Sequence, residues 1–411
     1  MRAFIIVFSV ILFFSCKEEK IQSVTMQDDV SFLASDSLNG RQTGTEGELA
    51  AAAYIEKRLK AIGLQPKGVA ASYTQTFSFK PSSNPHEQAE YTNETLEGMI
   101  TGTNVIGYLD NNAEHTVVIG AHYDHLGTGG EGSLYREEGD AIHNGADDNA
   151  SGVAIMLQLA ERLRQLPAPK NNYLFIAFSG EEMGLLGSNY FVKNPTVDAK
   201  KINYMINLDM VGRLNEEKTL AAYGVGTSPI FKQTLFANNT FDLNIAENDS
   251  GIGPSDHTSF YLADIPVLFF FTGQHSDYHK PTDDTEKLNF DGMETITSYI
   301  ESIVKDLDGA GKLAFRKTKN ESEEVPAFKV ALGVVPDYLF TGEGMRIDGI
   351  SEDKPAQKAG LQKGDVVIKL GDKETKDMMS YMKALATFEE GQTIEVTVNR
   401  SGEIITFEVT F

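Results

Sequence analysis

Tyr173-Leu174-Phe175-Ile176-Ala177-Phe178 is an unbroken apolar run, and it leads directly into Ser179-Gly180-Glu181-Glu182. Similar apolar runs occupy residues 116–121 and 204–208. A helical apolar pattern over residues 152–166 lies between the runs at 116–121 and 173–178. Strands that are apolar at nearly every position are buried on both faces, as parallel strands covered by helices are. We therefore expect an α/β domain with a mixed, mostly parallel central sheet and helices on both faces.

The remaining apolar patterns extend the same alternation in both directions along the chain. They predict strands at residues 105–109 and 265–271, and helices at residues 24–33, 46–62, 185–192 and 293–307. The polar, proline-containing stretch 77–91 is expected to be a loop. In sheets of this class ligands bind at the carboxyl ends of the strands, so the polar residues that follow each strand are candidate site residues.

Bulk composition narrows the class of protein. The chain has 411 residues, of which 41% are hydrophobic, so it can bury a substantial core and is not globally disordered. The formal net charge is -23, from 59 acidic and 36 basic residues. Such a charge repels phosphates, so we expect no nucleic acid partner.

The amino terminus resembles an export signal. Met1-Arg2 precedes an apolar run over residues 3–14, which is too short to span a bilayer and is typical of a signal peptide. Ser15-Cys16 at its end resembles the lipobox of bacterial lipoproteins, which implies lipidation of Cys16, the only cysteine. The protein is then an exported, membrane-anchored lipoprotein at the periplasmic face or cell surface of a bacterial outer membrane. The alternative is an ordinary secretion signal.

Five short segments carry metal-binding side chains, most of them directly after an expected strand: His122-Tyr123-Asp124, Gly145-Ala146-Asp147-Asp148-Asn149, Gly180-Glu181-Glu182, Asn207-Leu208-Asp209 and Tyr278-His279. Each alone has an ordinary structural explanation, such as a buried histidine, a helix cap or an acidic turn. Together they offer two histidines and several carboxylates. A pair of zinc ions needs a shared carboxylate and further nitrogen or oxygen ligands on each ion.

These segments, within longer blocks such as His-Tyr-Asp-His-Leu-Gly and Gly-Ala-Asp-Asp-Asn-Ala-Ser-Gly, resemble the signatures of the co-catalytic di-zinc aminopeptidases. The family includes leucyl aminopeptidase, glutamate carboxypeptidase and glutaminyl cyclase relatives, and the resemblance covers about residues 25–308. It implies two zinc ions per chain, with these roles: His122 and Asp209 on one ion, Glu182 and His279 on the other, Asp147 as the bridge, Glu181 as the general base and Asp124 orienting His122. It also implies a cis peptide at Asp147-Asp148, and Ser255-Asp256-His257 matches a supporting block.

The activity that the resemblance implies is hydrolysis of the N-terminal peptide bond of peptides with a free N-terminus. A metal-bridging water, activated by Glu181, attacks the carbonyl. Two alternatives remain at this level. One is a glutaminyl cyclase-type acyltransferase with one zinc ion, and the other is a catalytically inactive binding protein.

The composition of the chain changes after residue 308. We therefore expect four parts: a signal peptide at 1–16, an aminopeptidase domain at 21–308, a charged linker at 309–325 and a small α+β unit at 326–411. Residues 331–334 and 355–367 of this unit resemble a PDZ domain. Leu332, Gly333 and Val334 then correspond to the loop that binds a peptide C-terminal carboxylate. Capture of peptide or partner C-termini is the expected role, and packing on the peptidase domain or self-association is the alternative.

Overall fold

The computed structural model describes residues 24–80, 91–92, 98–130, 132–137, 139–318, 329–337, 340, 342–351 and 354–411. The predicted signal peptide and the lipidation site Cys16 lie outside these residues. Among the helices that are described, none combines the length and the apolar character needed to cross a membrane.

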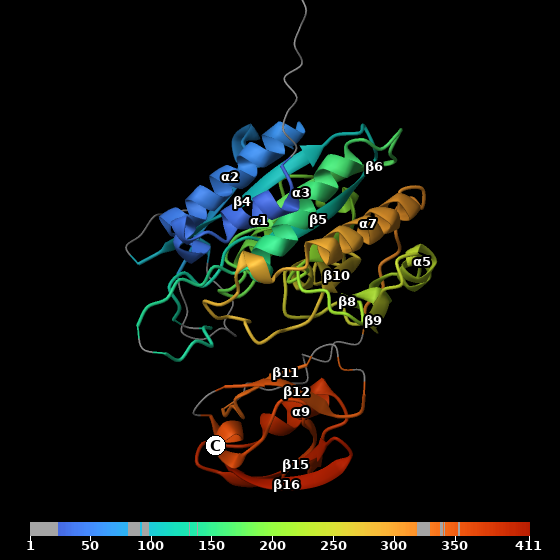
Figure 1. Ribbon diagram of the computed structural model, residues 1–411. Coiled ribbons are helices and arrows are strands. Elements are labelled where there is room, and N and C mark those ends of the chain that lie inside the picture. The colour runs from blue at the N-terminus through green and yellow to red at the C-terminus, as the bar shows by residue number, and fades with distance from the viewer. Residues whose placement is uncertain are drawn as a thin grey trace, which may run out of the picture.

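A ten-stranded sheet forms the frame of the larger unit (Figure 1), and its longest path runs in the order β3-β2-β4-β6-β5-β7-β10-β8-β9, with β1 paired to β4. The strands are β1 (Gln65–Pro66), β2 (Thr74–Phe79), β3 (Tyr91–Thr92), β4 (Ile100–Leu109), β5 (His115–His122), β6 (Asn171–Phe178), β7 (Ile202–Leu208), β8 (Thr219–Tyr223), β9 (Asn244–Asn248) and β10 (Val267–Phe271). Strands β6, β5, β7 and β10 are mutually parallel. Their carboxyl ends therefore meet at one edge of the sheet.

Helices cover this sheet on both faces. They are α1 (Met26–Leu33), α2 (Glu46–Ile62), α3 (Gly152–Leu163), α4 (Leu186–Lys193), α5 (Phe231–Asn238), α6 (His257–Tyr261) and α7 (Phe290–Leu307). Helices α1, α2, α3 and α7 share the larger apolar core on one face, as Figure 1 shows. On the other face α4 and α6 pack over a second apolar cluster. Every residue of β6 and β7 is buried, which confirms the expected α/β class.

The predicted loop at residues 77–91 is wrong at its start. Phe77 and Phe79 belong to β2, which pairs antiparallel with β4, and both side chains are buried against Leu186. Strand β2 buries alternate residues, so its apolar content is half that of a central strand and it carries a weaker sequence signal. The strands β8 and β9 and the helices α5 and α6, each five to eight residues long, were also not predicted.

The predicted linker begins with residues that pack on the larger unit. Leu313 is buried in its main core and its backbone N–H donates to Asn203 Oδ1 at 2.7 Å. Five residues later, the backbone N–H of Thr318 donates to the Tyr261 hydroxyl at 3.0 Å. The larger unit thus extends at least to residue 318.

The smaller unit is an antiparallel sheet in the order β11-β12-β13-β15-β16, with β14 paired to β13. Its elements are β11 (Val334–Pro336), β12 (Met345–Ile350), α8 (Pro355–Ala359), β13 (Val366–Leu370), β14 (Lys373–Glu374), α9 (Met378–Leu385), β15 (Thr393–Arg400) and β16 (Glu403–Thr410). It has an apolar core of its own, to which Leu332 contributes. Strand β11 lies at one end of the described strand order, directly after Leu332 and Gly333.

Candidate metal centre

The four central parallel strands deliver the candidate ligands to one place. His122 is the last residue of β5, Glu181 and Glu182 follow β6, and Asp209 follows β7. His279 lies in the loop after β10. A further carboxylate comes from the turn Ala146–Ser151 that precedes α3. This is the edge of the sheet where the sequence predicts ligand binding.

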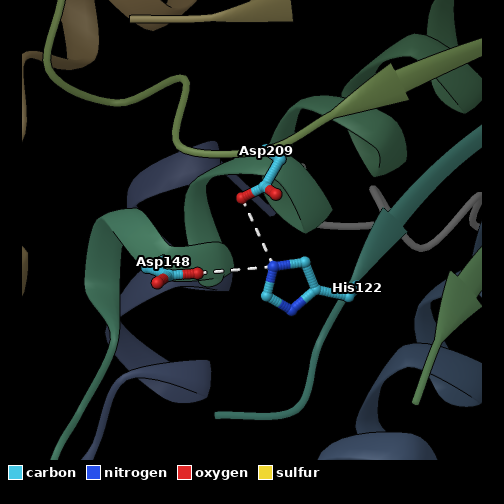
Figure 2. A group of neighbouring side chains, drawn as sticks. All are labelled: His122, Asp148 and Asp209. Atoms are coloured by element: carbon cyan, nitrogen blue, oxygen red, sulfur yellow. Dashed lines mark hydrogen bonds and ion pairs between the residues drawn. The ribbon is translucent and has the colours of Figure 1, made fainter. Parts of the chain in front are cut away.

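His122, Asp148 and Asp209 form the first ligand group. Nε2 of His122 lies 3.3 Å from Asp148 Oδ1 and 3.3 Å from Asp209 Oδ1. Figure 2 shows both carboxylates directed at this nitrogen from different sides. Atoms that bind one tetrahedral zinc ion at about 2.0–2.1 Å lie roughly 3.3–3.4 Å apart, so the spacing suits a shared cation.

A second ligand group uses the other oxygen of the same aspartate. Nε2 of His279 lies 3.2 Å from Asp148 Oδ2 and 3.4 Å from Glu182 Oε2. These separations again match the edges of a zinc tetrahedron. Asp148 therefore offers one oxygen to each group, which is the arrangement that a carboxylate shared by two cations requires.

The prediction that Asp147 is the shared carboxylate is corrected to Asp148. Asp147 turns away from the ligand groups: its Oδ1 accepts the Gly212 N–H at 2.6 Å and its Oδ2 lies 3.1 Å from His275 Nε2. The cis peptide is also shifted by one residue and joins Asp148 to Asn149. Two adjacent aspartates in a turn point in different directions, and the backbone of this turn directs the second one at the histidines.

Asp283 helps to set the direction of that turn. Its Oδ2 accepts the backbone N–H groups of Asp147 at 2.9 Å and Asp148 at 3.1 Å, and its backbone carbonyl accepts that of Ala146 at 3.0 Å. Burial raises the pKa of Asp283 to about 6. Asp283 follows His279 in the block Asp-Tyr-His-Lys-Pro-Thr-Asp-Asp, so a sequence signal existed for it, although no role was predicted.

Glu181 stands beside the first ligand group without belonging to it. Its Oε2 is 4.0 Å from His122 Nε2, and its backbone N–H donates to Asp124 Oδ1 at 3.2 Å. Burial raises the pKa of Glu181 well above its usual range, although His122 opposes this shift. A carboxylate with a raised pKa beside a cation site has the character of a general base.

Asp124 contacts His122 mainly through its backbone. The backbone oxygen of Asp124 is 3.2 Å from His122 Nδ1, whereas its carboxylate Oδ1 is 3.8 Å away. The carboxylate instead accepts hydrogen bonds from Thr43 Oγ1 at 3.0 Å and from the Glu181 backbone. Asp124 thus links the loop after β5 to the loop after β6.

The centre holds an excess of buried negative charge. Asp124, Asp148 and Asp209 are buried, and the side chains of Glu181 and Glu182 are only 11% and 9% exposed. The buried cation Arg41 lies close enough for Asp148 and Asp124 to raise its pKa. Burial lowers the pKa of His122, but Asp209 and Glu181 outweigh this effect and raise it well above its usual range. Buried carboxylates at this density need compensating cations, and two divalent ions would supply the charge.

Arg41 is completely buried and donates only to backbone carbonyls. Its guanidinium bonds Tyr123 O at 2.8 Å, Asn144 O at 2.6 Å and Gly145 O at 3.0 Å, and also bonds Leu33 O. Burial lowers the pKa of Arg41 to about 10, against the pull of Asp148 and Asp124. The residue joins the loop that carries His122 to the turn that carries Asp148.

A pocket opens directly over the ligand groups. Besides the ligands and Glu181 it is lined by Met210, Tyr223, Pro254, Phe269, Phe271, Gln274 and Tyr278. Its walls are therefore mainly apolar and aromatic, with the charged groups at its base. A bound molecule would meet the candidate ligands from this side.

Ser255, Asp256 and His257 lie close behind this pocket and are fully buried. Ser255 Oγ accepts a hydrogen bond from Asn207 Nδ2 at 2.7 Å, and His257 stacks on Phe269 with 4.5 Å between ring centroids. Neither nitrogen of His257 has a hydrogen-bond partner among the described residues, and burial lowers its pKa to about 3. The block is thus part of the wall and base of the site and contributes no ligand.

Comparison with known proteins identifies both units. Residues 104–304 match the profile of peptidase family M28, and residues 313–411 match that of the PDZ domain. The larger unit is similar to peptidase family M28 over residues 104–304. The predicted resemblance to the di-zinc aminopeptidases and to PDZ domains is therefore confirmed.

Individual curated proteins match part of this chain. The alkaline phosphatase isozyme conversion protein of Escherichia coli is 31% identical over 171 residues, which are 41% of this chain and 46% of that protein. Aminopeptidase YwaD of Bacillus subtilis is 29% identical over 229 residues, which are 52% of this chain and 45% of that protein. The chain thus spans about half the length of these curated relatives.

Solved structures share the fold of the larger unit at low sequence identity. A zinc aminopeptidase from Bacillus subtilis superposes with a TM-score of 0.53 at 16% identity, covering 72% of this chain and 97% of that one. The glutaminyl cyclase of Porphyromonas gingivalis gives 0.54 at 18% identity, covering 69% and 97%. Because peptidases and cyclases match equally well, the fold does not distinguish the two reactions.

Proposed function

We propose that the larger unit is a zinc-dependent aminopeptidase that hydrolyses the N-terminal bond of peptides. The observation that carries the proposal is the position of Asp148, with one oxygen in each of two ligand groups of tetrahedral spacing. The match to the M28 profile and relatives named as zinc metalloproteases and aminopeptidases support zinc as the metal. His122, Asp148 and Asp209 would hold one ion, and Asp148, Glu182 and His279 the other.

Two zinc ions at these positions would polarise the scissile carbonyl and acidify the attacking water. Glu181 lies next to the ligand groups without occupying a ligand position, so its carboxylate is free to accept a proton from that water. The same carboxyl group then returns the proton to the leaving amine. Asp124 and Thr43 hold the loop that carries Glu181 in place.

The free α-amino group of the substrate is proposed to bind near the ion held by Glu182 and His279. The side chain of the substrate's N-terminal residue would then enter the pocket between Met210, Phe269 and Phe271. Gln274 also lines this pocket, and its Oε1 has no hydrogen-bond partner in the part of the chain that the structure describes. This oxygen can accept a hydrogen bond from the substrate backbone.

A glutaminyl cyclase-type acyltransferase with one zinc ion is the second candidate, because solved cyclases share the fold. The presence of two complete ligand groups favours the peptidase. Metal content by mass spectrometry, measured with turnover of aminoacyl anilides and of N-terminal glutaminyl peptides, separates the candidates. Two zinc ions with anilide hydrolysis support the aminopeptidase, whereas one ion with cyclisation would overturn it. An inactive binding protein would turn over neither substrate.

We further propose that the PDZ unit captures peptide C-termini along β11. This strand lies at one end of the described sheet order, and Leu332-Gly333-Val334 leads into it with Gly333 at φ +79°. A peptide can add to such an edge strand while its carboxylate meets the backbone N–H groups of the preceding loop. Binding of labelled peptides with free and amidated C-termini tests this role, since the amidated peptide should bind at least tenfold more weakly.

Lipidation of Cys16 and attachment to a bacterial outer membrane also remain proposals, supported by the sequence pattern at residues 1–16. Incorporation of labelled fatty acid into the full-length chain, compared with Cys16→Ser, tests the anchor. An unmodified wild-type chain that is still exported would support an ordinary secretion signal.

A further inference from the structure

His125 is a buried histidine that contacts the candidate metal centre and has no role in the proposed reaction so far. Its Nδ1 lies 2.7 Å from Glu182 Oε1 and 3.9 Å from Asp148 Oδ2. Its exposed fraction is 1%. Glu182 thus has one oxygen facing His125 and the other, Oε2, facing His279 at 3.4 Å.

The 2.7 Å separation distinguishes a hydrogen bond from shared metal ligation. Two atoms bound to one tetrahedral zinc ion lie roughly 3.3 Å apart, as the His279 and Glu182 atoms do. A separation of 2.7 Å between a nitrogen and a carboxylate oxygen is that of a charge-assisted hydrogen bond. His125 therefore acts on Glu182 itself, and His279 is the nitrogen ligand of this group.

The protonation pattern of the ring agrees with this assignment. Nε2 of His125 is buried and has no hydrogen-bond partner among the described residues. A proton on Nε2 would leave a buried donor unpaired, at a cost of about 1–3 kcal/mol. A proton on Nδ1 instead has Glu182 Oε1 as its acceptor. The Nδ1–H tautomer is thus the one that the surroundings accommodate.

Neighbouring backbone fixes the His125 ring before any ligand binds. A Cβ atom on Gly145 would come within 2.5 Å of the ring carbon Cδ2, so the ring packs directly on this glycine. The backbone N–H of His125 donates to Arg41 O at 3.3 Å, and Arg41 in turn donates to Gly145 O at 3.0 Å. The ring therefore cannot swing toward or away from Glu182 without displacing the turn before Asp148.

We infer that His125 is a positioning residue, which donates Nδ1–H to Glu182 Oε1 and thereby presents Oε2 to the second cation position. The inference rests on the proposed two-ion site. Groups that orient a metal ligand through a hydrogen bond typically change metal affinity by about 10–100-fold when they are removed. The effect should fall on the Glu182 and His279 position and spare the His122 and Asp209 position.

Two matched substitutions test the contact. In His125→Asn the amide nitrogen can occupy the place of Nδ1, whereas in His125→Gln it reaches the place of Nε2. The metal-free full chain is titrated with Zn²⁺ in competition with a chelating dye, which reports two affinities without any turnover. We expect His125→Gln to weaken one of the two affinities by about 10–100-fold, and His125→Asn to keep both within about threefold of wild type.

His143 supplies the matched control for this titration. It is buried and its ring centroid is 6.5 Å from that of His125, yet it bonds Ser133 Oγ and Ala141 O instead of a candidate ligand. His143→Gln should leave both zinc affinities unchanged. Thermal unfolding of the metal-free variants reports whether any loss of affinity follows from a loss of folding.

Equal behaviour of the two His125 variants would overturn the inference. If both keep both affinities, the hydrogen bond does not position Glu182. If both lose one affinity equally, the ring is needed as a ligand or as packing, and not as a donor at Nδ1. A wild-type chain that binds two ions and cleaves no aminoacyl substrate would overturn the proposed function and leave this inference standing.

Discussion

Nε2 of His275 lies 3.1 Å from Oδ2 of Asp147, and this contact accounts for the different places of two adjacent aspartates. His275 belongs to the loop after β10, which also carries His279. With its carboxylate held by His275 and by the Gly212 N–H, Asp147 stays outside the ligand groups. Of the two aspartates, only Asp148 faces His122 and His279.

Asparagine substitutions should separate these two aspartates. Asp148→Asn removes the charge that both cation positions share, so we expect it to lose both zinc ions after dialysis. Asp147→Asn keeps the size of the side chain and removes no ligand, so it should retain two ions. Mass spectrometry of the metal content checks both. Equal retention by the two variants would show that Asp148 is not the bridge.

Replacement of Glu181 should separate metal binding from turnover. Glu181→Ala and Glu181→Gln remove the proposed proton acceptor but no ligand, so both variants should bind zinc like wild type. The kcat for an aminoacyl anilide should fall by about 10²–10⁴-fold, as is typical for loss of a general base. The exposed Glu216→Gln serves as the control. Turnover by Glu181→Gln at the wild-type rate would remove Glu181 from the mechanism.

Arg41 should contribute strongly to folding stability. Arg41→Met leaves four backbone carbonyls without their donor, in a site with no solvent exposure. Loss of one partner of such a buried charged network costs about 3–5 kcal/mol, which urea unfolding of the metal-free chain can measure. Arg164→Met, at an exposed position, should change the free energy of unfolding by no more than about 0.5 kcal/mol.

His257 should make the fold sensitive to mild acid. Burial lowers the pKa of His257 to about 3 in the folded chain, whereas an unfolded histidine titrates near pH 6.5. Below about pH 6.5 the unfolded chain binds a proton at this histidine and the folded chain does not. The free energy of unfolding therefore decreases as the pH is lowered, until the pH reaches the folded pKa. Within this range, each pH unit lowers the free energy of unfolding by about 1.4 kcal/mol.

The matching variant is His257→Leu, which has no proton to bind in either state. Between pH 7.5 and pH 5.0, wild type should lose roughly 2 kcal/mol more folding free energy than the variant. Urea unfolding in the presence of a chelator measures this difference without a contribution from bound metal. Parallel pH profiles for the two proteins would show that folding does not lower the pKa of His257.

Deletion of residues 326–411 should affect long and short substrates differently. If the PDZ unit captures peptide C-termini, its loss raises KM for long peptides and leaves aminoacyl anilides unaffected. Steady-state kinetics on a peptide series of increasing length provides the measurement. An equal change for long and short substrates would favour a packing role for the unit.

The frame of the site could be predicted because its signals are local. The central strands, such as β6 and β7, are buried throughout and mostly apolar, and each is followed within a few residues by a polar residue that can bind metal. That pattern by itself assigns His122, Glu182 and Asp209 to one edge of the sheet. The fold also brings His279 and Glu181 to the same edge, as the predicted order of the segments implies.

The choice between Asp147 and Asp148 could not be made from local sequence. Both are aspartates in one turn, and the residues that orient that turn are Asp283 and His275, more than 120 residues away in the chain. The contact of His125 with Glu182 was missed for the same reason, since it joins loops after different strands. Long-range hydrogen bonds determine where these side chains lie, and such hydrogen bonds cannot be predicted from the spacing of residues in the sequence.

The two ligand groups have a consequence for the time at which hydrolysis can begin. His122 ends β5 and His279 follows β10, so the complete set of ligands exists only when the last parallel strand has joined the sheet. A chain whose synthesis has not reached His279 lacks one candidate cation position and with it half of the proposed reaction centre. Closure of the sheet by β10 and assembly of the second candidate cation position are therefore one event in folding.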